Sequence, residues 1–295
     1  MKHILITGCS SGFGLMAAKH FSKKGHHVYA TMRNVNGKNA HKASELKEYA
    51  NANKLNIDVV EIDVTSDESV SKAMLKIGNV DVLINNAGRG FGGPIESFSS
   101  QQFIDQLDLN IVGTFRVAKA VLPKMREQSN GLIIQISSIA GRCCSPGFGI
   151  YHTSKWGVEG LSESMRYELA PLGIDVVMVQ PGPFATDFFN TIIPSENEEI
   201  ARAYQHVGEF SEGFANQVIA AFENPDAPTD PMLVVQAFDD LIEMPNGTRP
   251  IRTMVGMDFG LRAINEVTEP IRQGLLEVFE ISEWDGPKEQ LISHP

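Results

Sequence analysis

The chain has 295 residues, which is enough for one large α/β domain or two smaller domains. Hydrophobic residues make up 42% of it, so a core can form and global disorder is disfavoured. The formal net charge of −11 argues against nucleic-acid binding, which requires a basic face, and against docking on an anionic membrane.

The cysteines and the N-terminal residues indicate the compartment. The chain has three cysteines: Cys9, Cys143 and Cys144. Because the number is odd and two of them are adjacent, a disulfide framework is disfavoured and a reducing compartment is favoured. The apolar run from Ile4 to Ile6 is too short for a signal peptide, and no stretch approaches the roughly 18–20 apolar residues of a transmembrane helix. We therefore expect a cytoplasmic protein with no membrane partner. The histidines show no metal-ligand spacing, which predicts no metal site.

Short β-type runs alternate with amphipathic helical runs up to residue 179. The pattern predicts strands over 3–7, 27–31, 57–62, 80–84, 131–136 and 174–179. Three helices are expected between the first four strands: one that ends at Gly25, one over 43–51 and one capped by Ser66. Two more end near Arg126, and a long helix covers 151–172 and ends at Gly173. This alternation is typical of a parallel sheet with helices on both faces.

The pattern becomes less regular after Pro183, although 251–255 is expected to form one last strand. We assign 1–282 to a single domain and 283–295 to a loosely held polar tail. The segment 183–215 follows the sixth strand, a position that suits a lid over a ligand. Its apolar side chains favour a bulky apolar substrate, although several of them could instead pack as ordinary core: Phe184, Phe188, Phe189, Ile192, Ile193, Tyr204, Val207, Phe210 and Phe214.

The first predicted strand runs into a glycine-rich turn. Glycines let the backbone turn sharply and approach a pyrophosphate closely, and the following helix directs its positive end at that anion. The spacing G-x-x-x-G-x-G differs from the commonest dinucleotide fingerprint, so an ordinary strand–helix turn is the alternative. The expected cofactor contacts of this turn are Gly8, Ser10, Ser11, Gly12, Phe13 and Gly14.

The second predicted strand ends at Arg33, where a carboxylate usually holds the ribose of NAD. A guanidinium can pair with a 2′-phosphate and Ser11 can add a hydroxyl donor, so NADP(H) is favoured over NAD(H), unless Arg33 is only a solvated charge. Asp63, with Val64, suits the adenine end of the cofactor, or else forms a turn ahead of Thr65. Small residues after the fourth strand allow backbone contact with the adenosine half, unless they form a turn without a ligand: Asn86, Ala87 and Gly88.

Four polar residues suit proton chemistry. Tyr151 and Lys155 lie four apart on a predicted helix and share a face, although a surface pair is the alternative. A nearby ammonium is expected to lower the phenol pKa from about 10, so that Tyr151 exchanges a proton near neutral pH. Ser138 ends the fifth strand and would face the same crevice, holding the reacting oxygen. Asn110 lies mid-helix, where asparagine is disfavoured, which suggests a buried polar function or a tolerated surface position.

Together these residues resemble the short-chain dehydrogenase/reductase family. The motifs occur in order over about 1–190: Thr7-Gly8-x-x-x-Gly12-x-Gly14, Asp63, Asn85-Asn86-Ala87-Gly88, Asn110, Ser138, Tyr151-x-x-x-Lys155 and Pro181-Gly182. The segment from Val28 to Asn34 is similar to that of hydroxysteroid and retinol dehydrogenases, where an arginine tends to accompany NADP. The resemblance implies one Rossmann domain with a seven-stranded sheet ordered 3-2-1-4-5-6-7. The chain departs from the family in being longer than its usual core, with the excess toward the C-terminus.

The resemblance also implies a role for each site residue. Tyr151 would be the general acid/base, Ser138 would orient the substrate oxygen, and Lys155 would bind the nicotinamide ribose and lower the tyrosine pKa. Asn110 would hold a water that relays protons to Lys155. Further cofactor contacts would come from Pro181, Gly182, the backbone near Phe184 and the hydroxyl of Thr186.

The sequence therefore predicts an NADP(H)-dependent oxidoreductase that moves a hydride between a nicotinamide and a carbonyl or alcohol carbon. Two other classes remain as alternatives. A lyase or epimerase on the same fold would use NAD transiently, and a nicotinamide-sensing binding protein would lack turnover, although such sensors usually lose the tyrosine or the lysine.

The sequence also suggests which residues line the substrate pocket and how copies of the chain associate. His152 is expected to face away from the site. Val117 and Leu161, read as outer apolar positions on helices through which the family often pairs, predict a homodimer or homotetramer. Three further residues are expected to line the substrate pocket: Cys143, Cys144 and Phe148.

Overall fold

The computed structural model describes residues 1–288, so the end of the predicted polar tail, from residue 289 onward, lies outside the described residues. One seven-stranded sheet organises the chain, and its strand order is β3-β2-β1-β4-β6-β7-β9. The strands are β1 His3–Ile6, β2 His27–Met32, β3 Ile57–Glu61, β4 Val82–Asn85, β6 Gly131–Ile136, β7 Ile174–Pro181 and β9 Arg252–Val255. Every neighbouring pair is parallel, and counting these strands along the chain gives the predicted order 3-2-1-4-5-6-7, which is confirmed.

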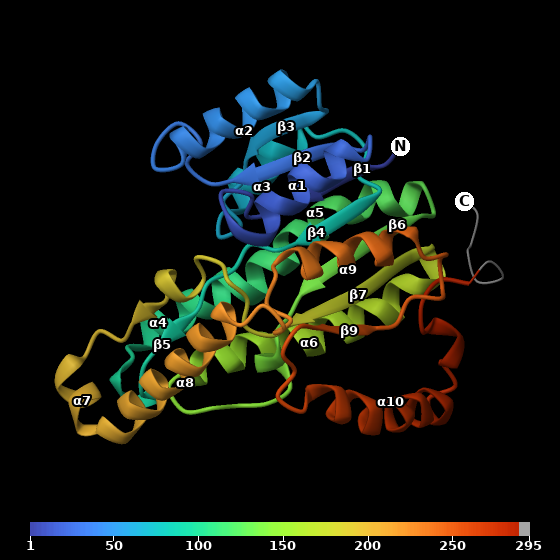
Figure 1. Ribbon diagram of the computed structural model, residues 1–295. Coiled ribbons are helices and arrows are strands. Elements are labelled where there is room, and N and C mark those ends of the chain that lie inside the picture. The colour runs from blue at the N-terminus through green and yellow to red at the C-terminus, as the bar shows by residue number, and fades with distance from the viewer. Residues whose placement is uncertain (289–295) are drawn as a thin grey trace.

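Helices cover both faces of the sheet (Figure 1). The helices are α1 Gly12–Lys23, α2 Ala40–Asn53, α3 Asp67–Met74, α4 Ser100–Leu107, α5 Gly113–Glu127, α6 Gly149–Leu169, α7 Glu198–Ala203, α8 Gln205–Glu223, α9 Met232–Glu243 and α10 Leu261–Val278. Strand residues alternate between two cores: Ile4 and Ile6 pack with α1, α2 and α9, whereas Leu5 packs with α3, α5 and α6. This is the doubly wound α/β architecture expected from the sequence.

Local chemistry sets several element boundaries. The Ser66 hydroxyl accepts a hydrogen bond from the Ser69 backbone at 3.2 Å and caps α3 as predicted. Gly173 adopts φ of +78° after α6 and its short 3₁₀ extension, which ends the helical segment where the sequence indicated. A second small sheet pairs β5, Phe91–Gly92, with β8, Ile193–Pro194, and so ties the segment after β7 to the segment after β4.

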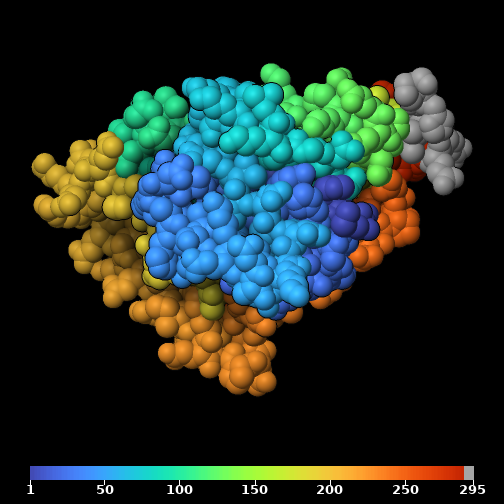
Figure 2. All heavy atoms as spheres, turned by 90° about the horizontal axis from the view of Figure 1, so that it is seen from above, coloured from blue at the N-terminus to red at the C-terminus, as the bar shows by residue number. Residues whose placement is uncertain are grey.

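The region after Pro183 is more regular than its sequence pattern indicated, because α7 to α10 lie within it. Figure 2 shows part of this region, in gold, projecting to one side of the blue N-terminal half. The described part of the predicted tail is held rather than loose. Asp285 binds Arg166 at 2.6 Å and Arg272 at 2.7 Å, and Arg166 reaches the fully buried Asp175 at 2.6 Å. Charged hydrogen bonds therefore anchor the C-terminal residues to α6 and β7.

Val117 corrects one expectation from the sequence. It is fully buried against the sheet and is no outer position of α5. The exposed apolar side chains of this region are instead Val112, Phe115 on α5 and Trp156 on α6, with exposed fractions of 40%, 44% and 48%.

Candidate active site

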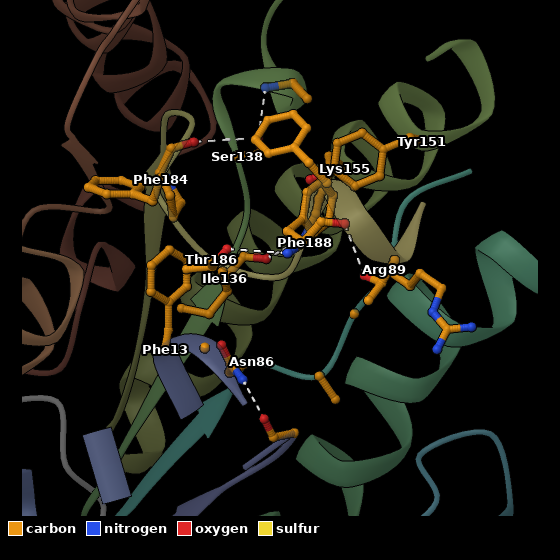
Figure 3. A pocket seen from close by; sticks show the side chains of 18 of the residues that line it. Phe13, Asn86, Arg89, Ile136, Ser138, Tyr151, Lys155, Phe184, Thr186 and Phe188 are labelled. Atoms are coloured by element: carbon orange, nitrogen blue, oxygen red, sulfur yellow. Dashed lines mark hydrogen bonds between the residues drawn. The ribbon is translucent and has the colours of Figure 1, made fainter. Parts of the chain in front are cut away.

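A cavity of about 710 Å³ opens at the carboxyl ends of the central strands. It is lined from one end to the other by the glycine turn after β1, the residues after β2, β3, β4, β6 and β7, the start of α6, and the aromatic segment 184–214. Figure 3 shows its central part, with Phe13 and Asn86 at one end and Tyr151 and Phe188 at the other. Most of the residues predicted for cofactor, substrate and catalysis therefore line one continuous space.

The glycine turn has the geometry of an anion cradle. Gly8 and Gly12 adopt φ of +75° and +56°, which L side chains rarely adopt. A Cβ on Gly14 would lie 2.5 Å from the Gly8 carbonyl oxygen and 2.6 Å from Asn86 Nδ2, so only glycine fits there. Asn86 Nδ2 in turn donates to the Thr7 carbonyl at 2.8 Å, which pins the turn to the end of β4. The start of α1 thus faces the cavity, and the residues present fit a dinucleotide pyrophosphate.

The residues after β2 and β3 form the adenosine end. Arg33 is exposed and lines the cavity, and Lys38, which the sequence analysis missed, lies on the same wall. Asp63 Oδ1 accepts hydrogen bonds from the backbone and the hydroxyl of Thr65 at 3.0 and 2.7 Å, so the turn considered as the alternative is present. Asp63 lines the cavity as well, with Val64, so the turn does not remove it from the position predicted for the adenine.

Three polar side chains meet at the catalytic end. The Ser138 hydroxyl neighbours the Tyr151 phenol, and it accepts a hydrogen bond from the Ala140 backbone at 3.2 Å. Lys155 Nζ donates to the Ile136 carbonyl at 2.7 Å and lies 5.8 Å from the centroid of the Tyr151 ring. Tyr151 and Lys155 are one turn apart on α6, and Ser138 follows β6, as the sequence predicted.

The pKa values of this cluster differ from the expectation. Burial raises the pKa of Tyr151 to about 12, and the neighbouring Ser138 hydroxyl only partly opposes this rise. Burial lowers the pKa of Lys155 to about 8, with Glu159 on the next turn of α6 opposing the fall. The pKa of the phenol is therefore raised in this structure and not lowered as expected, because desolvation is its largest cause.

Asn110 is buried but does not line the cavity. It lies in a π-helical turn, Asp108–Val112, between α4 and α5. Its Nδ2 donates to Ser154 Oγ at 2.9 Å and to the Arg89 carbonyl at 3.1 Å, and its Oδ1 accepts from the Arg89 backbone at 3.2 Å. The predicted buried polar function is thus present, and it joins the loop after β4 to α6.

The substrate end is a wall of aromatic side chains. Phe188 lies closest to the chemistry, with its ring 5.6 Å from that of Tyr151. The expectation for Cys143, Cys144 and Phe148 is confirmed, since all three line the cavity. The rest of the wall consists of Phe184, Phe189, Phe210 and Phe214, together with Gln217 and Phe259, which the sequence analysis missed. Four residues of the predicted lid do not reach the cavity: Ile192, Ile193, Tyr204 and Val207.

His152 corrects another expectation, because it lines the cavity instead of facing away. Its Nδ1 pairs with the Ala140 carbonyl at 3.0 Å, and its Nε2 accepts from the Ser145 backbone at 3.0 Å. The ring thus fixes the loop between β6 and α6.

No helix within residues 1–288 is long and apolar enough to cross a membrane. In the same part of the chain, no three His, Cys, Asp or Glu side chains gather in a group that could hold a metal ion.

The fold and the cavity together define a Rossmann-type nucleotide-binding protein. A profile of the short chain dehydrogenase family matches residues 2–197. The 3-ketodihydrosphingosine reductase of Bacteroides thetaiotaomicron is 42% identical over 209 residues, which cover 68% of this chain and 72% of the relative. Human retinol dehydrogenase 8 is 40% identical over 189 residues, covering 63% of this chain and 60% of the relative.

A solved structure agrees over nearly the whole length. A short-chain dehydrogenase from Streptomyces avermitilis superposes with a TM-score of 0.74 at 30% identity, covering 96% of this chain and 98% of that one. The chain belongs to the short-chain dehydrogenase/reductase family and is an oxidoreductase of that family, whose members use NAD(H) or NADP(H). The expected likeness to its retinol and hydroxysteroid dehydrogenase branch is confirmed.

Proposed function

We propose that the protein is an NADP(H)-dependent enzyme that interconverts a carbonyl and an alcohol on a bulky apolar substrate. One observation carries the proposal: Ser138, Tyr151 and Lys155 lie in a single cavity, between a glycine turn that suits a pyrophosphate and a wall of aromatic side chains. A substrate held by that wall and a cofactor held by that turn would meet at the tyrosine.

The roles of the catalytic residues follow from their contacts and charges. The nicotinamide, when bound, supplies or accepts the hydride. Tyr151 keeps its proton near neutral pH, because its pKa is about 12, and it can therefore protonate the oxygen of a carbonyl as that carbon is reduced. The Ser138 hydroxyl neighbours the phenol and would hold the same oxygen in place. The Lys155 ammonium, buried beside them, would stabilise the phenolate that remains.

The cofactor contacts proposed from the sequence all line the cavity, with the exception of Gly14. Gly14 instead allows the close packing of the turn described above. The NADP preference rests on Arg33 and Lys38, two cations on the wall of a protein with net charge −11. A 2′-phosphate would neutralise these charges, whereas a ribose hydroxyl would leave them unmatched.

The substrate class rests on the aromatic wall, which offers apolar surface and few hydrogen-bonding groups. Two relatives are named for 3-ketodihydrosphingosine and retinol, a ketone and an alcohol on lipid-like molecules, and this supports an apolar substrate here. We assign the segment 183–215 as the lid that closes over it, together with the rest of α8, and 1–282 as one catalytic domain.

The partner and the compartment are also proposals. Exposed Val112, Phe115 and Trp156 form apolar positions around α5 and α6 that a second copy of the chain could cover, which favours a homodimer or homotetramer. A monomeric mass in light scattering would contradict this. The three cysteines are free thiols, which supports a reducing, cytoplasmic compartment.

The test follows cofactor oxidation at 340 nm with NADPH and NADH in parallel, over a panel of apolar ketones and aldehydes. Tyr151→Phe serves as the matched variant, because it removes only the phenol hydroxyl. We expect turnover with NADPH above that with NADH, and its loss in the variant. Equal or better turnover with NADH would refute the cofactor preference. Tight nucleotide binding without turnover by the wild-type protein would instead favour a nicotinamide sensor.

A further inference from the structure

Arg89 lines the cavity but belongs to none of the sequence motifs to which a function was assigned above. It follows Gly88 directly after β4, and it lines the cavity together with Arg33, Lys38 and Lys155. In the described chain none of these four side chains forms an ion pair, although the protein carries 36 acidic residues against 25 lysines and arginines. Cations that line one cavity and form no ion pair with its carboxylates favour an anionic ligand there.

Three side-chain hydrogen bonds hold the backbone of Arg89 in place. Asn110 holds its N–H and its carbonyl at 3.2 and 3.1 Å, and Gln106 donates to the same carbonyl at 2.9 Å. Gly90 follows, and a Cβ there would meet the Phe188 ring at 3.0 Å. The starting point of the Arg89 side chain is therefore set by three hydrogen bonds, while its guanidinium has no protein partner among the described residues.

The direction of the side chain separates it from the catalytic cluster. Figure 3 shows the Arg89 guanidinium extending away from Tyr151 and Lys155. It lies near enough to Arg33 that repulsion between the two guanidiniums adds to burial in lowering the pKa of Arg89. Two like charges that repel each other across one cavity, neither of them in an ion pair, are an unfavourable arrangement, which an anion bound between them would relieve.

We propose that Arg89 is a second phosphate-binding guanidinium, which acts with Arg33 on the 2′-phosphate of NADP(H) and so helps to determine cofactor specificity. The inference rests on the proposed NADP(H) dependence. A phosphate monoester carries up to two negative charges and three acceptor oxygens, so it can accept from two guanidiniums at once. The pyrophosphate, by contrast, has its own donors in the backbone of the glycine turn.

The test measures equilibrium binding of NADPH and NADH by nucleotide fluorescence, without any substrate. The variants are Arg89→Met, Arg33→Met, their combination, and Arg126→Met, a matched control on the exposed end of α5, outside the cavity. Adenosine 2′,5′-bisphosphate and 5′-AMP serve as competitors that differ only in the 2′-phosphate. Thermal unfolding of each variant checks that it folds.

We expect Arg89→Met to weaken NADPH and the bisphosphate about tenfold, since a partly solvated charged hydrogen bond is lost. NADH and 5′-AMP should change by less than about twofold, as should all four ligands in Arg126→Met. The combined variant should lose less than the product of the two single losses, because both guanidiniums act on one group.

Two results would overturn the inference. Equal weakening of NADPH and NADH would place Arg89 on a group that both cofactors share, and unchanged binding of both would leave it without a cofactor contact. Both are distinct from failure of the proposed function. If Arg33→Met abolishes a clear NADPH preference while Arg89→Met does not, only the role of Arg89 is wrong; if the wild-type protein binds no nucleotide, the proposed function itself fails.

Discussion

The pKa of Lys155 predicts an alkaline limit to carbonyl reduction. Burial lowers this pKa from 10.5 to about 8, which corresponds to roughly 3 kcal/mol against the ammonium form. Below about pH 8 the ammonium is present and can stabilise the phenolate left when Tyr151 gives up its proton. Above that pH the charge is lost, so kcat/KM for NADPH should be level up to about pH 7 and fall to about a tenth by pH 9.

Three other groups of the cavity, Tyr151, His152 and Cys143, titrate outside this window. The pKa of Tyr151 is about 12, so the phenol keeps its proton throughout. Burial lowers the pKa of His152 from 6.5, which places its titration on the acid side, and burial raises the pKa of Cys143 from 9.0, which places its titration above the window. A fall centred near pH 8 is therefore the one expected of Lys155 and not of these three groups.

The assay varies NADPH at fixed ketone, because kcat/KM for the cofactor reports the ionisations of the free enzyme, the state that the structure describes. Lys155→Arg is the informative variant, since its guanidinium stays charged across the whole range and should abolish the alkaline fall even if the rate is lower. Lys155→Met should be weakly active at every pH. A wild-type profile that stays level to pH 10, or a fall that persists in Lys155→Arg, would refute the argument.

Three further substitutions test the turn, the C-terminal anchor and the aromatic wall. Gly14→Ala should weaken NADPH and NADH alike, because the added Cβ would overlap the turn and Asn86 at 2.6 Å; binding titrations with both cofactors check this. Asp175→Asn should lower the free energy of unfolding by about 3 kcal/mol in urea titrations, since it leaves two buried arginines without their shared carboxylate. Phe188→Ala should raise KM for bulky ketones more than it lowers kcat in steady-state assays, because the ring packs beside Tyr151 without a polar atom.

The sheet and most of the site could be predicted because their signals are local. A buried strand, a glycine turn and a helix cap each occupy a few consecutive residues, and parallel strands bring their carboxyl ends to one edge. Arg33, Asp63, Asn86 and Ser138 each follow a different strand, yet all line the same cavity. Their convergence follows from topology alone, and no long-range contact had to be known.

The residues that were missed reach the cavity by tertiary packing. Phe259 lies on the loop after β9, 45 residues beyond Phe214, yet their rings are 5.9 Å apart. Lys38 lies in an irregular turn where a lysine is ordinary. Sequence periodicity carries no information on such pairs, because they depend on how far each loop folds back over the sheet edge.

The error on Val117 has a related cause. The α5 helix carries apolar residues on more than one side: Val117 and Val121 are buried, whereas Phe115 is exposed. Periodicity shows that a helix has an apolar face, but two such faces cannot be ranked without knowing which one meets the sheet. The pKa of Tyr151 was also misjudged because of burial: the sequence shows an ammonium four residues away, but it does not show the desolvation that raises the pKa of the phenol.

Asn110 shows how the cofactor end and the chemical end of the cavity act as one unit. Its amide is satisfied on one side by the backbone of Arg89 and on the other by the hydroxyl of Ser154, which precedes Lys155 on α6. A buried amide with all of these bonds made is costly to move, because any shift leaves a polar group unpaired. The π-helical turn that carries Asn110 therefore fixes the distance between the loop after β4 and the Tyr151–Lys155 turn. A residue outside the cavity thus sets the geometry in which the cavity's own side chains meet their ligands.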